Sequence, residues 1–418
     1  MTDHHTLTPS SSATPTTKGQ APRLPLVVWV LALGTFLMGT TEFIVAGVLP
    51  EMASDLGVPL ARTGLSITVF AIGMIVGTPT MAALTRRLSR RTTLVSALGV
   101  FAAGHLVAAL TPSFEVLLGA RSITAFATGA FWAIAAVVAL EVAGPAGGTR
   151  ALAIVLGGGM LANILGVPAG TLLGQLVGWR GPFWALAALA LLTSVFVART
   201  VPADQKDRSA TSLIRETAAF RSPRLWLVLL TCALTNAGAL SIYSFVAPLI
   251  TERAGSDASA IPLALVAFGA AALLGFLLAG RFGDAHPYAI ALTFAIGTLV
   301  FAVTLLTVST DPMLAIVAFG ALGLTASSAN PILVRLAVHF GRDAPTLASA
   351  MATSSFNAGT ALGSAIAGIT LETSAGPAGP VIVGIVGAAT VLLPLSALAV
   401  LHIRTGQAEP LKQQALVT

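Results

Sequence analysis

Twelve long apolar segments alternate with short polar connections along the chain. They cover residues 26–49, 62–84, 93–111, 116–139, 150–176, 181–199, 224–250, 260–280, 287–309, 312–335, 345–371 and 378–402. A helix that crosses a membrane needs about 20 predominantly apolar residues. The pattern therefore predicts twelve transmembrane helices.

The segments are too long for transmembrane β-strands, which have about 10 residues and alternate apolar with polar positions. Lipid supplies no hydrogen-bond partners, so each crossing backbone must satisfy its own polar groups, as a helix does. The predicted fold class is therefore an all-α membrane protein.

Composition supports a lipid environment for most of the chain. Only 9% of the 418 residues are charged and 56% are hydrophobic, whereas soluble domains carry about 25% charge. So few charges cannot cover the surface of soluble domains of this total length. The single cysteine, Cys232, excludes an intramolecular disulfide and a metal site built on several cysteines. We expect no metal and no cofactor.

The basic residues predict the orientation, because cytoplasmic loops are enriched in Lys and Arg. With both termini placed in the cytoplasm, eighteen of the 22 Lys and Arg fall on the cytoplasmic side, three fall outside and one lies within a span. The net charge of +6 is then explained by the basic residues of the cytoplasmic loops. Because the chain has no basic domain, no nucleic-acid partner is expected.

The longest polar connection between two predicted spans, at 200–223, divides the chain into two halves. We predict a disordered cytoplasmic tail at 1–25, six-helix bundles at 26–199 and 224–404, a cytoplasmic linker at 200–223 and a tail at 405–418. When the second half of the sequence is aligned with the first at an offset of 201 residues, weak repeats coincide and Tyr243 aligns with Glu42. Two six-helix repeats are typical of a rocking secondary transporter.

Three ionisable residues are predicted at one depth within the membrane. Glu42 lies eight residues before Pro50, about 12 Å below the outer end of its helix at ~1.5 Å per residue. His105 and Arg121, on the third and fourth spans, lie at a similar level. Burial favours the protonated carboxyl and a nearby arginine favours the carboxylate, so Glu42 and Arg121 are candidates for proton coupling, with His105 and Asp284 as further candidates.

Structural roles stay open for each of these residues. Glu42 and Arg121 could form a purely structural ion pair, and a neighbouring carbonyl could satisfy His105. Polar and aromatic residues in the spans are candidates for a substrate cavity, although interhelical hydrogen bonding and core packing explain them as well. These candidates are Phe131, Trp132, Asn163, Asn236, Tyr243 and Asn357.

A glycine-rich run at 157–170, GGGMLANILGVPAG, lies within the fifth span and has no preceding strand, so it is not a nucleotide-binding loop. Small residues let helices approach closely in lipid. We therefore expect Gly157, Gly166, Pro168 and Gly170 to form a close, kinked packing surface.

These motifs resemble the major facilitator superfamily, and in particular its bacterial twelve-helix drug:proton antiporters. The resemblance covers about 26–404. GTTEFIVAGVLPEMASDLGV at 39–58 is similar to the helix-one signature of chloramphenicol-resistance efflux proteins, whose branch includes arabinose, sugar and nucleoside exporters. RSITAFATG, which begins at Arg121, is similar to the helix-four motif that the family associates with proton transfer. The run at 157–170 is similar to the family's helix-five antiporter motif.

The loop AALTRRLSRR at 82–91 resembles the family's G-x-x-x-D-R-x-G-R-R turn but departs from it. Its acid and both glycines are replaced, by Arg86, Ala82 and Ser89. The resemblance implies a cytoplasmic gate built from Arg87, Arg90 and Arg91, with Arg281 and Asp284 in the second half.

The resemblance implies a plasma-membrane antiporter that works by alternating access and exports a small amphipathic drug, chloramphenicol or a related antibiotic, in exchange for protons. A sugar or nucleoside exporter is the alternative. A membrane-embedded enzyme or a channel is disfavoured, because the spans show neither a nucleophile–base pair nor a repeated selectivity ring. The expected partners are a small molecule, protons and lipid, with the monomer as the functional unit.

Overall fold

The computed structural model describes residues 24–84, 88–202, 222–342 and 344–415, and every regular element in these ranges is a helix. The first half contains α1 (Leu26–Leu56), α2 (Leu60–Thr63), α3 (Leu65–Leu84), α4 (Arg90–Leu110), α5 (Phe114–Leu161), η2 (Ala162–Gly166), α6 (Val167–Val177) and α7 (Arg180–Thr200). The second contains α9 (Pro223–Ser244), α10 (Val246–Pro248), η4 (Leu249–Arg253), α11 (Ala260–Phe282), α12 (Pro287–Val308), α13 (Pro312–Ala326), α14 (Asn330–Phe340), α15 (Pro345–Leu371), η5 (Gly376–Ala378) and α16 (Gly379–Ala415).

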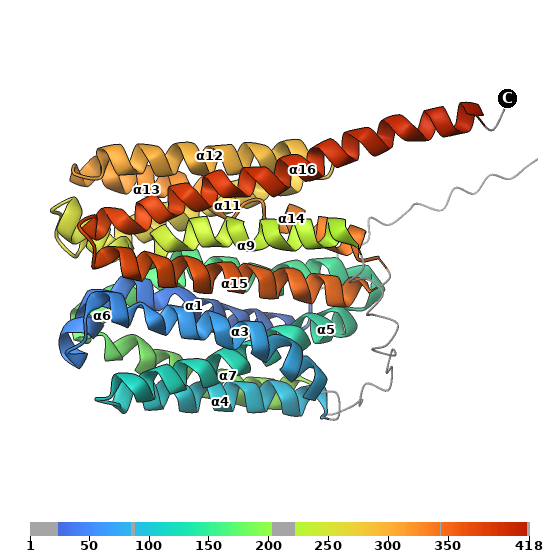
Figure 1. Ribbon diagram of the computed structural model, residues 1–418. Helices are drawn as coiled ribbons and strands as arrows, with labels where there is room; N and C mark the ends of the chain where they lie inside the picture. The colour runs from blue at the N-terminus through green and yellow to red at the C-terminus, as the bar shows by residue number, and fades with distance from the viewer. Residues whose placement is uncertain (1–23, 85–87, 203–221, 343, 416–418) are drawn as a thin grey trace, which may run out of the picture.

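The all-helical membrane fold is confirmed. Within the described ranges, eleven helical segments are long and apolar enough to cross a membrane. The remaining predicted segment is occupied by α15, a helix of 27 residues. The helices lie roughly side by side, and α16 runs on to Ala415, past the end of the last predicted span (Figure 1).

Several crossings are interrupted where the sequence weakens the helix. Between the fourth and fifth predicted spans the helix runs on as α5, with one break at Gly144, whose φ of 63° favours glycine. The first crossing of each half breaks shortly before a proline, at Val48 ahead of Pro50 and at Phe245 ahead of Pro248. The proline ring removes a backbone donor and disrupts the turn before it.

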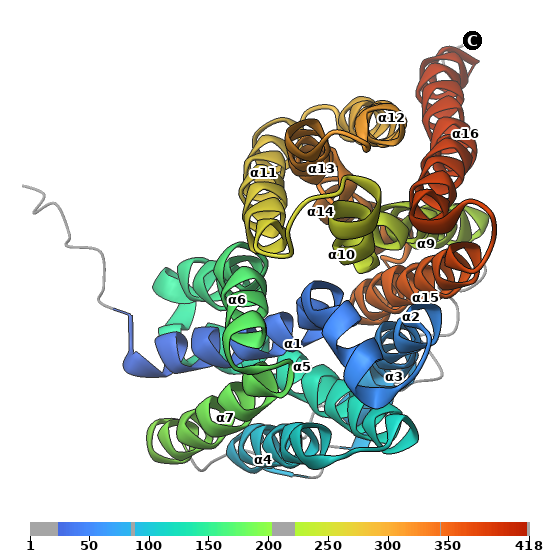
Figure 2. The ribbon, with the colours of Figure 1, turned by 90° about the vertical axis from the view of Figure 1, so that its left-hand side faces the viewer.

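The two halves form separate groups of helices that meet along two seams. Seen end-on, α1–α7 lie together and α9–α16 lie together, with α3 beside α15 and α6 beside α11 (Figure 2). The α3–α15 seam carries a hydrogen bond of 2.8 Å between the Thr68 and Ser364 hydroxyl groups. At the other seam, Gly269 lies against the backbone of Asn163, where a Cβ atom would meet the Asn163 oxygen at 2.7 Å.

The hydrophobic core differs between the two ends of the bundle. We call the end where the first and last described residues lie the terminal side, and the opposite end the far side. On the far side one continuous cluster joins residues of both halves, from Ile44 and Phe183 to Tyr243 and Phe319. On the terminal side the core divides into two clusters, one within each half. The halves are therefore packed together at the far side and have separate cores at the terminal side.

Candidate functional site

Arg121 is the most completely buried charged side chain in the described part of the protein, with 1% of its surface exposed. It lies on α5 and reaches two other helices of the same half. Nη1 donates to the carbonyl oxygen and to the hydroxyl of Thr41, both at 2.9 Å, and Nε donates to the Ser66 carbonyl at 3.4 Å. The guanidinium also lies 4.2 Å from the centre of the Phe70 ring, a favourable cation–π distance.

One nitrogen of this guanidinium has no partner. Nη2 is buried and makes no hydrogen bond. An unsatisfied buried donor costs about 1–3 kcal/mol, and more when the group is charged. The site therefore holds a fixed positive charge with one donor free for an acceptor.

Thr41 links Arg121 to His105. Its hydroxyl accepts from Arg121 Nη1 and lies 2.7 Å from His105 Nε2, while His105 Nδ1 lies 2.8 Å from the Phe101 carbonyl. A carbonyl can only accept, so Nδ1 carries the ring proton and Nε2 accepts the hydroxyl proton of Thr41. This pattern satisfies a neutral imidazole at both nitrogens, which is the structural alternative for His105.

Glu42 follows Thr41 on α1 and stays partly exposed, whereas its neighbours Thr41 and Ile44 are buried. Within the described contacts its carboxylate forms no ion pair of 4 Å or less, while Thr41, the residue before it, accepts two hydrogen bonds from Arg121. The predicted pair thus lies close together without direct contact, and Arg121 is held by Thr41 and Ser66 instead.

Tyr243 brings the second half to the same place. Its ring lies 5.6 Å from that of Phe43 on α1 and 5.0 Å from that of Phe268 on α11, both edge-on. Phe319 of α13 completes the cluster at 6.2 Å. Edge-on aromatic pairs at these distances are favourable, so the cluster joins the halves directly beside Glu42.

A group of polar side chains lies in the second half, on α9, α14 and α15. The Asn330 amide donates to Asn236 Oδ1 at 3.3 Å, and the Asn236 amide donates to the Thr360 hydroxyl at 3.4 Å. Asn330 Oδ1 is buried without a partner. We call these three residues the amide cluster. Asn357 is not joined to it directly, because its amide donates to the Thr353 carbonyl of its own helix at 3.1 Å.

Sequence reasoning missed Asn330, Thr360 and the residues that hold Arg121. Asn330 stands at the break between α13 and α14 and is followed by Pro331. An Asn-Pro pair in an apolar span signals such an interruption, so this signal was present in the sequence.

The other cavity candidates take different positions. Phe131 is fully buried against α1, where a Cβ atom at Gly34 would lie 2.1 Å from its ring. Trp132 is partly exposed and its indole nitrogen is buried without a partner. Asn163 lies in the π-helical turn η2 at the α11 seam.

The glycine-rich run packs the fifth crossing onto α1. A Cβ atom at Gly166 would lie 2.1 Å from the Thr40 hydroxyl, and one at Gly170 would lie 2.3 Å from Ile44. Pro168 follows the π-helical turn and is buried. Gly157 has no neighbouring atom within 4 Å of such a Cβ, so the packing role falls on Gly158, where a Cβ would lie 2.2 Å from the Ala32 carbonyl oxygen.

The two terminal-side loops make ion pairs within their own halves. Arg90, at the start of α4, pairs with Glu141 of α5, and Asp284, after α11, pairs with Arg335 of α14. Arg335 also donates to the Gly283 carbonyl at 3.0 Å. Arg91 is half-buried and Arg281 is exposed, whereas Arg87 lies outside the described residues.

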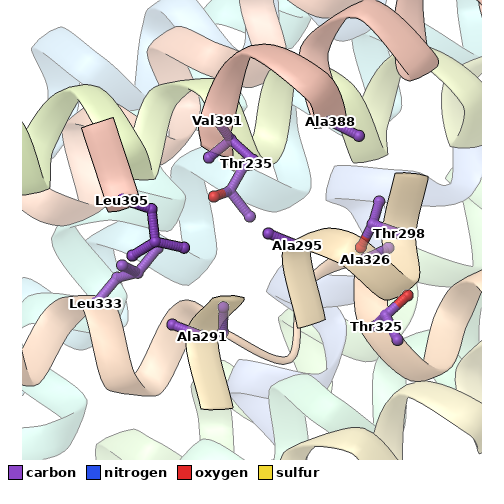
Figure 3. Close-up of a pocket in the computed structure, with 11 residues that line it drawn as sticks. Thr235, Ala291, Ala295, Thr298, Thr325, Ala326, Leu333, Ala388, Val391 and Leu395 are labelled. Atoms are coloured by element: carbon purple, nitrogen blue, oxygen red, sulfur yellow. The ribbon is translucent and has the colours of Figure 1, made fainter. Parts of the chain in front are cut away.

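A small cavity lies inside the second half between α9, α12, α13, α14 and α16 (Figure 3). Its volume is about 10 Å³, and apart from Thr235, Thr298 and Thr325 its walls are apolar. That space holds about one water molecule, far below the ~300–1,000 Å³ of a site for a drug-sized ligand. Across the described ranges, no group of three or more His, Cys, Asp or Glu side chains is placed to hold a metal ion.

Comparison with known proteins identifies the family. A model described as Major Facilitator Superfamily matches residues 31–285 and 229–416. The chain belongs to the major facilitator superfamily. The predicted family is thereby confirmed, and the protein is a multi-pass protein of the plasma membrane from a family of transporters.

Relatives within the superfamily agree with this assignment. A chloramphenicol resistance protein of Streptomyces lividans is 37% identical over 360 residues, which cover 85% of this chain and 92% of the relative. Two solved structures share the fold. A bacterial homologue of the human lysosomal transporter Spinster has a TM-score of 0.72 at 18% identity, covering 91% of this chain and 97% of that one. The nucleoside transporter NupG has a TM-score of 0.70 at 15% identity, covering 90% and 99%.

Proposed function

We propose that this superfamily member is a proton-coupled antiporter that exports a small amphipathic drug, chloramphenicol or a related antibiotic, from the cell. The similarity to the chloramphenicol resistance protein of Streptomyces lividans supports the substrate class. The observation that carries the proposal is the position of Glu42 within a span, directly after Thr41, which accepts two hydrogen bonds from the fully buried and incompletely paired guanidinium of Arg121.

The proposed topology has twelve crossings, with α15 as the eleventh in order, and the terminal side in the cytoplasm. The basic residues of the loops favour this orientation. The separate cores on the terminal side and the single core on the far side then correspond to a state that is closed to the outside.

In the proposed cycle, Glu42 is ionised when drug enters from the cytoplasm and gains a proton in the outward-open state. Protonation removes the attraction between the carboxylate and Arg121, which lets the guanidinium stay with Thr41 and Ser66. Drug leaves outward, the halves rock back, and the proton departs to the cytoplasm. The transmembrane potential contributes about 2.3 kcal/mol per charge for each 100 mV.

The amide cluster is the proposed polar anchor for the drug. Asn330 Oδ1 offers an acceptor, and a hydroxyl or amide N–H of the substrate would satisfy it.

A sugar or nucleoside exporter is the second candidate function. The similarity to the putative transporter AraJ of Escherichia coli, at 32% identity over 61% of this chain, fits this candidate but does not favour it over the first. Sugar sites need many hydrogen-bonding side chains, and this chain has only two tyrosines.

The two candidates are separated by transport into inside-out vesicles that hold a proton gradient, acid inside. We expect accumulation of labelled chloramphenicol that collapses when a protonophore is added. Accumulation of a labelled pentose or nucleoside with no phenicol uptake would replace the drug assignment by the second candidate.

A further inference from the structure

Glu42 and Tyr243 align in the weak sequence repeat of the two halves, and Tyr243 packs against the residue after Glu42 at the interface between the halves. The sequence alignment of the two halves at an offset of 201 residues places Tyr243 at the position of Glu42. In the folded protein the Tyr243 ring packs edge-on against Phe43, the residue after Glu42, with 5.6 Å between the ring centres. An acidic residue of α1 and a hydroxyl of α9 therefore lie near one another where the two halves meet.

The Tyr243 hydroxyl is buried without a hydrogen bond, although its ring is held tightly. The side chain is 3% exposed and its ring contacts Phe43 and Phe268. A buried phenol usually finds a partner for its O–H. This unpaired donor faces the interface in which Glu42 is the nearby acceptor.

We propose that Tyr243 is the positioning residue that connects the proton on Glu42 with the contact between the halves. The inference rests on the proposed function and assigns a partner to the same site. When Glu42 is ionised, the Tyr243 hydroxyl donates to the carboxylate. When Glu42 is protonated, the hydrogen bond weakens, because a charged acceptor binds a donor about twice as strongly as a neutral one.

The ring cluster transmits this change to the packing of the far side. Phe43, Phe268 and Phe319 surround Tyr243 and come from both halves. A rotation of the phenol toward Glu42 must shift these edge-on contacts. Proton binding in the first half thereby alters how the halves meet.

The other titratable and charged groups near Glu42 come from the neighbouring helices α4 and α5. Arg121 of α5 and His105 of α4 both reach the residue before Glu42, through hydrogen bonds to Thr41. The rings that α11 and α13 contribute belong to phenylalanines, which do not titrate. Tyr243 is thus the titratable member of this aromatic cluster.

The chain offers a sharp test because Tyr243 and Tyr288 are its only tyrosines. Full-length protein in nanodiscs, carrying tyrosine labelled with ¹³C at the carbon that bears the hydroxyl, gives two signals, which Tyr288→Phe assigns. We expect the Tyr243 signal to move between pH 5 and 8 and to stop moving in Glu42→Gln. A Tyr243 signal that is static in the parent, or that moves equally in Glu42→Gln, would overturn the inference.

Transport supplies a second readout. Tyr243→Phe keeps the ring contacts and removes the hydroxyl, so the ionised carboxylate loses a donor. We expect the pH midpoint of drug efflux to rise by about one unit, a tenfold change in proton affinity, with Tyr288→Phe unchanged. A raised KM at an unchanged midpoint would assign Tyr243 to drug contact and overturn the coupling role. If the parent shows no proton-coupled efflux, the proposed function fails instead.

Discussion

The two halves are both bundles of helices but differ in the chemistry of their buried polar residues. In the described ranges, the first half buries Arg121 and His105 and places Glu42 beside them. The buried polar side chains of the second half are hydroxyls and amides, such as Thr360 and Asn357, with no buried charge among them. The two helical bundles thus bury different kinds of polar side chain.

This difference suggests a division of labour between the halves. A proton carrier needs a carboxyl whose charged and neutral forms are close in free energy, which burial beside a cation provides. A neutral drug needs hydrogen-bonding groups that keep their charge state throughout the cycle, which amides provide. The first half is therefore proposed to bind the proton and the second half to recognise the drug.

The largest expected effect comes from removing the fixed charge of the first half. Arg121→Ala leaves Glu42 without its cation and Thr41 and Ser66 without their donor. We expect uphill drug uptake into vesicles to fall at least ~100-fold, equivalent to about 2.7 kcal/mol. Arg121→Lys should restore little of it, because an ammonium cannot reproduce the planar fork.

The matched control is Arg62→Ala. Arg62 forms an exposed ion pair with Glu115, and such pairs are worth only about 0.2–1 kcal/mol. If Arg121→Ala takes up drug nearly as well as the parent, the buried charge has no role in transport. The proposed difference between the halves would then be wrong.

Much of the fold was predictable from the sequence, because apolar length and loop charge determine where helices cross. Where the sequence analysis expected a close, kinked packing surface in the fifth span, the structure has a π-helical turn at 162–166 and close contacts at Gly166 and Gly170, and none at Gly157. The continuation of α5 through 140–149 was not predictable. The sequence predicts a connection between two spans there, whereas the structure is helical apart from the break at Gly144.

The site was less predictable than the fold. Charged residues in apolar spans are conspicuous, so Glu42, His105 and Arg121 could be selected from the sequence. The partners of Arg121 are the backbone carbonyls of Thr41 and Ser66 and the hydroxyl of Thr41, which a sequence does not distinguish from dozens of similar groups. The amide cluster depends on which helices pack together, and one sequence contains no record of that.

A smaller effect is expected at the link between Arg121 and His105. Thr41→Val keeps the shape of the side chain and removes the hydroxyl that joins the two. Losing one charged hydrogen bond at ~1.5–3 kcal/mol should lower efflux roughly 10- to 100-fold. Thr40→Val is the control, because the Thr40 hydroxyl donates only within its own helix, to Phe36. Equal efflux by the two variants would exclude the link.

The smallest effect is expected in the second half. Asn330→Ala removes the unpaired acceptor and the hydrogen bond to Asn236. One neutral hydrogen bond at ~0.5–1.5 kcal/mol corresponds to a rise of about 2- to 12-fold in the KM for drug. The pH midpoint of transport should not move. A shifted midpoint with an unchanged KM would contradict the division of labour.

The central claim, that Glu42 carries the proton, is tested most directly by drug-triggered proton release. Purified protein in weakly buffered solution is mixed with chloramphenicol and the pH change is recorded, with Glu115→Gln as a control at an exposed acid. Glu42→Gln mimics a permanently protonated acid, so we predict that it binds drug and releases no proton. Proton release by Glu42→Gln equal to that of the parent would contradict the account.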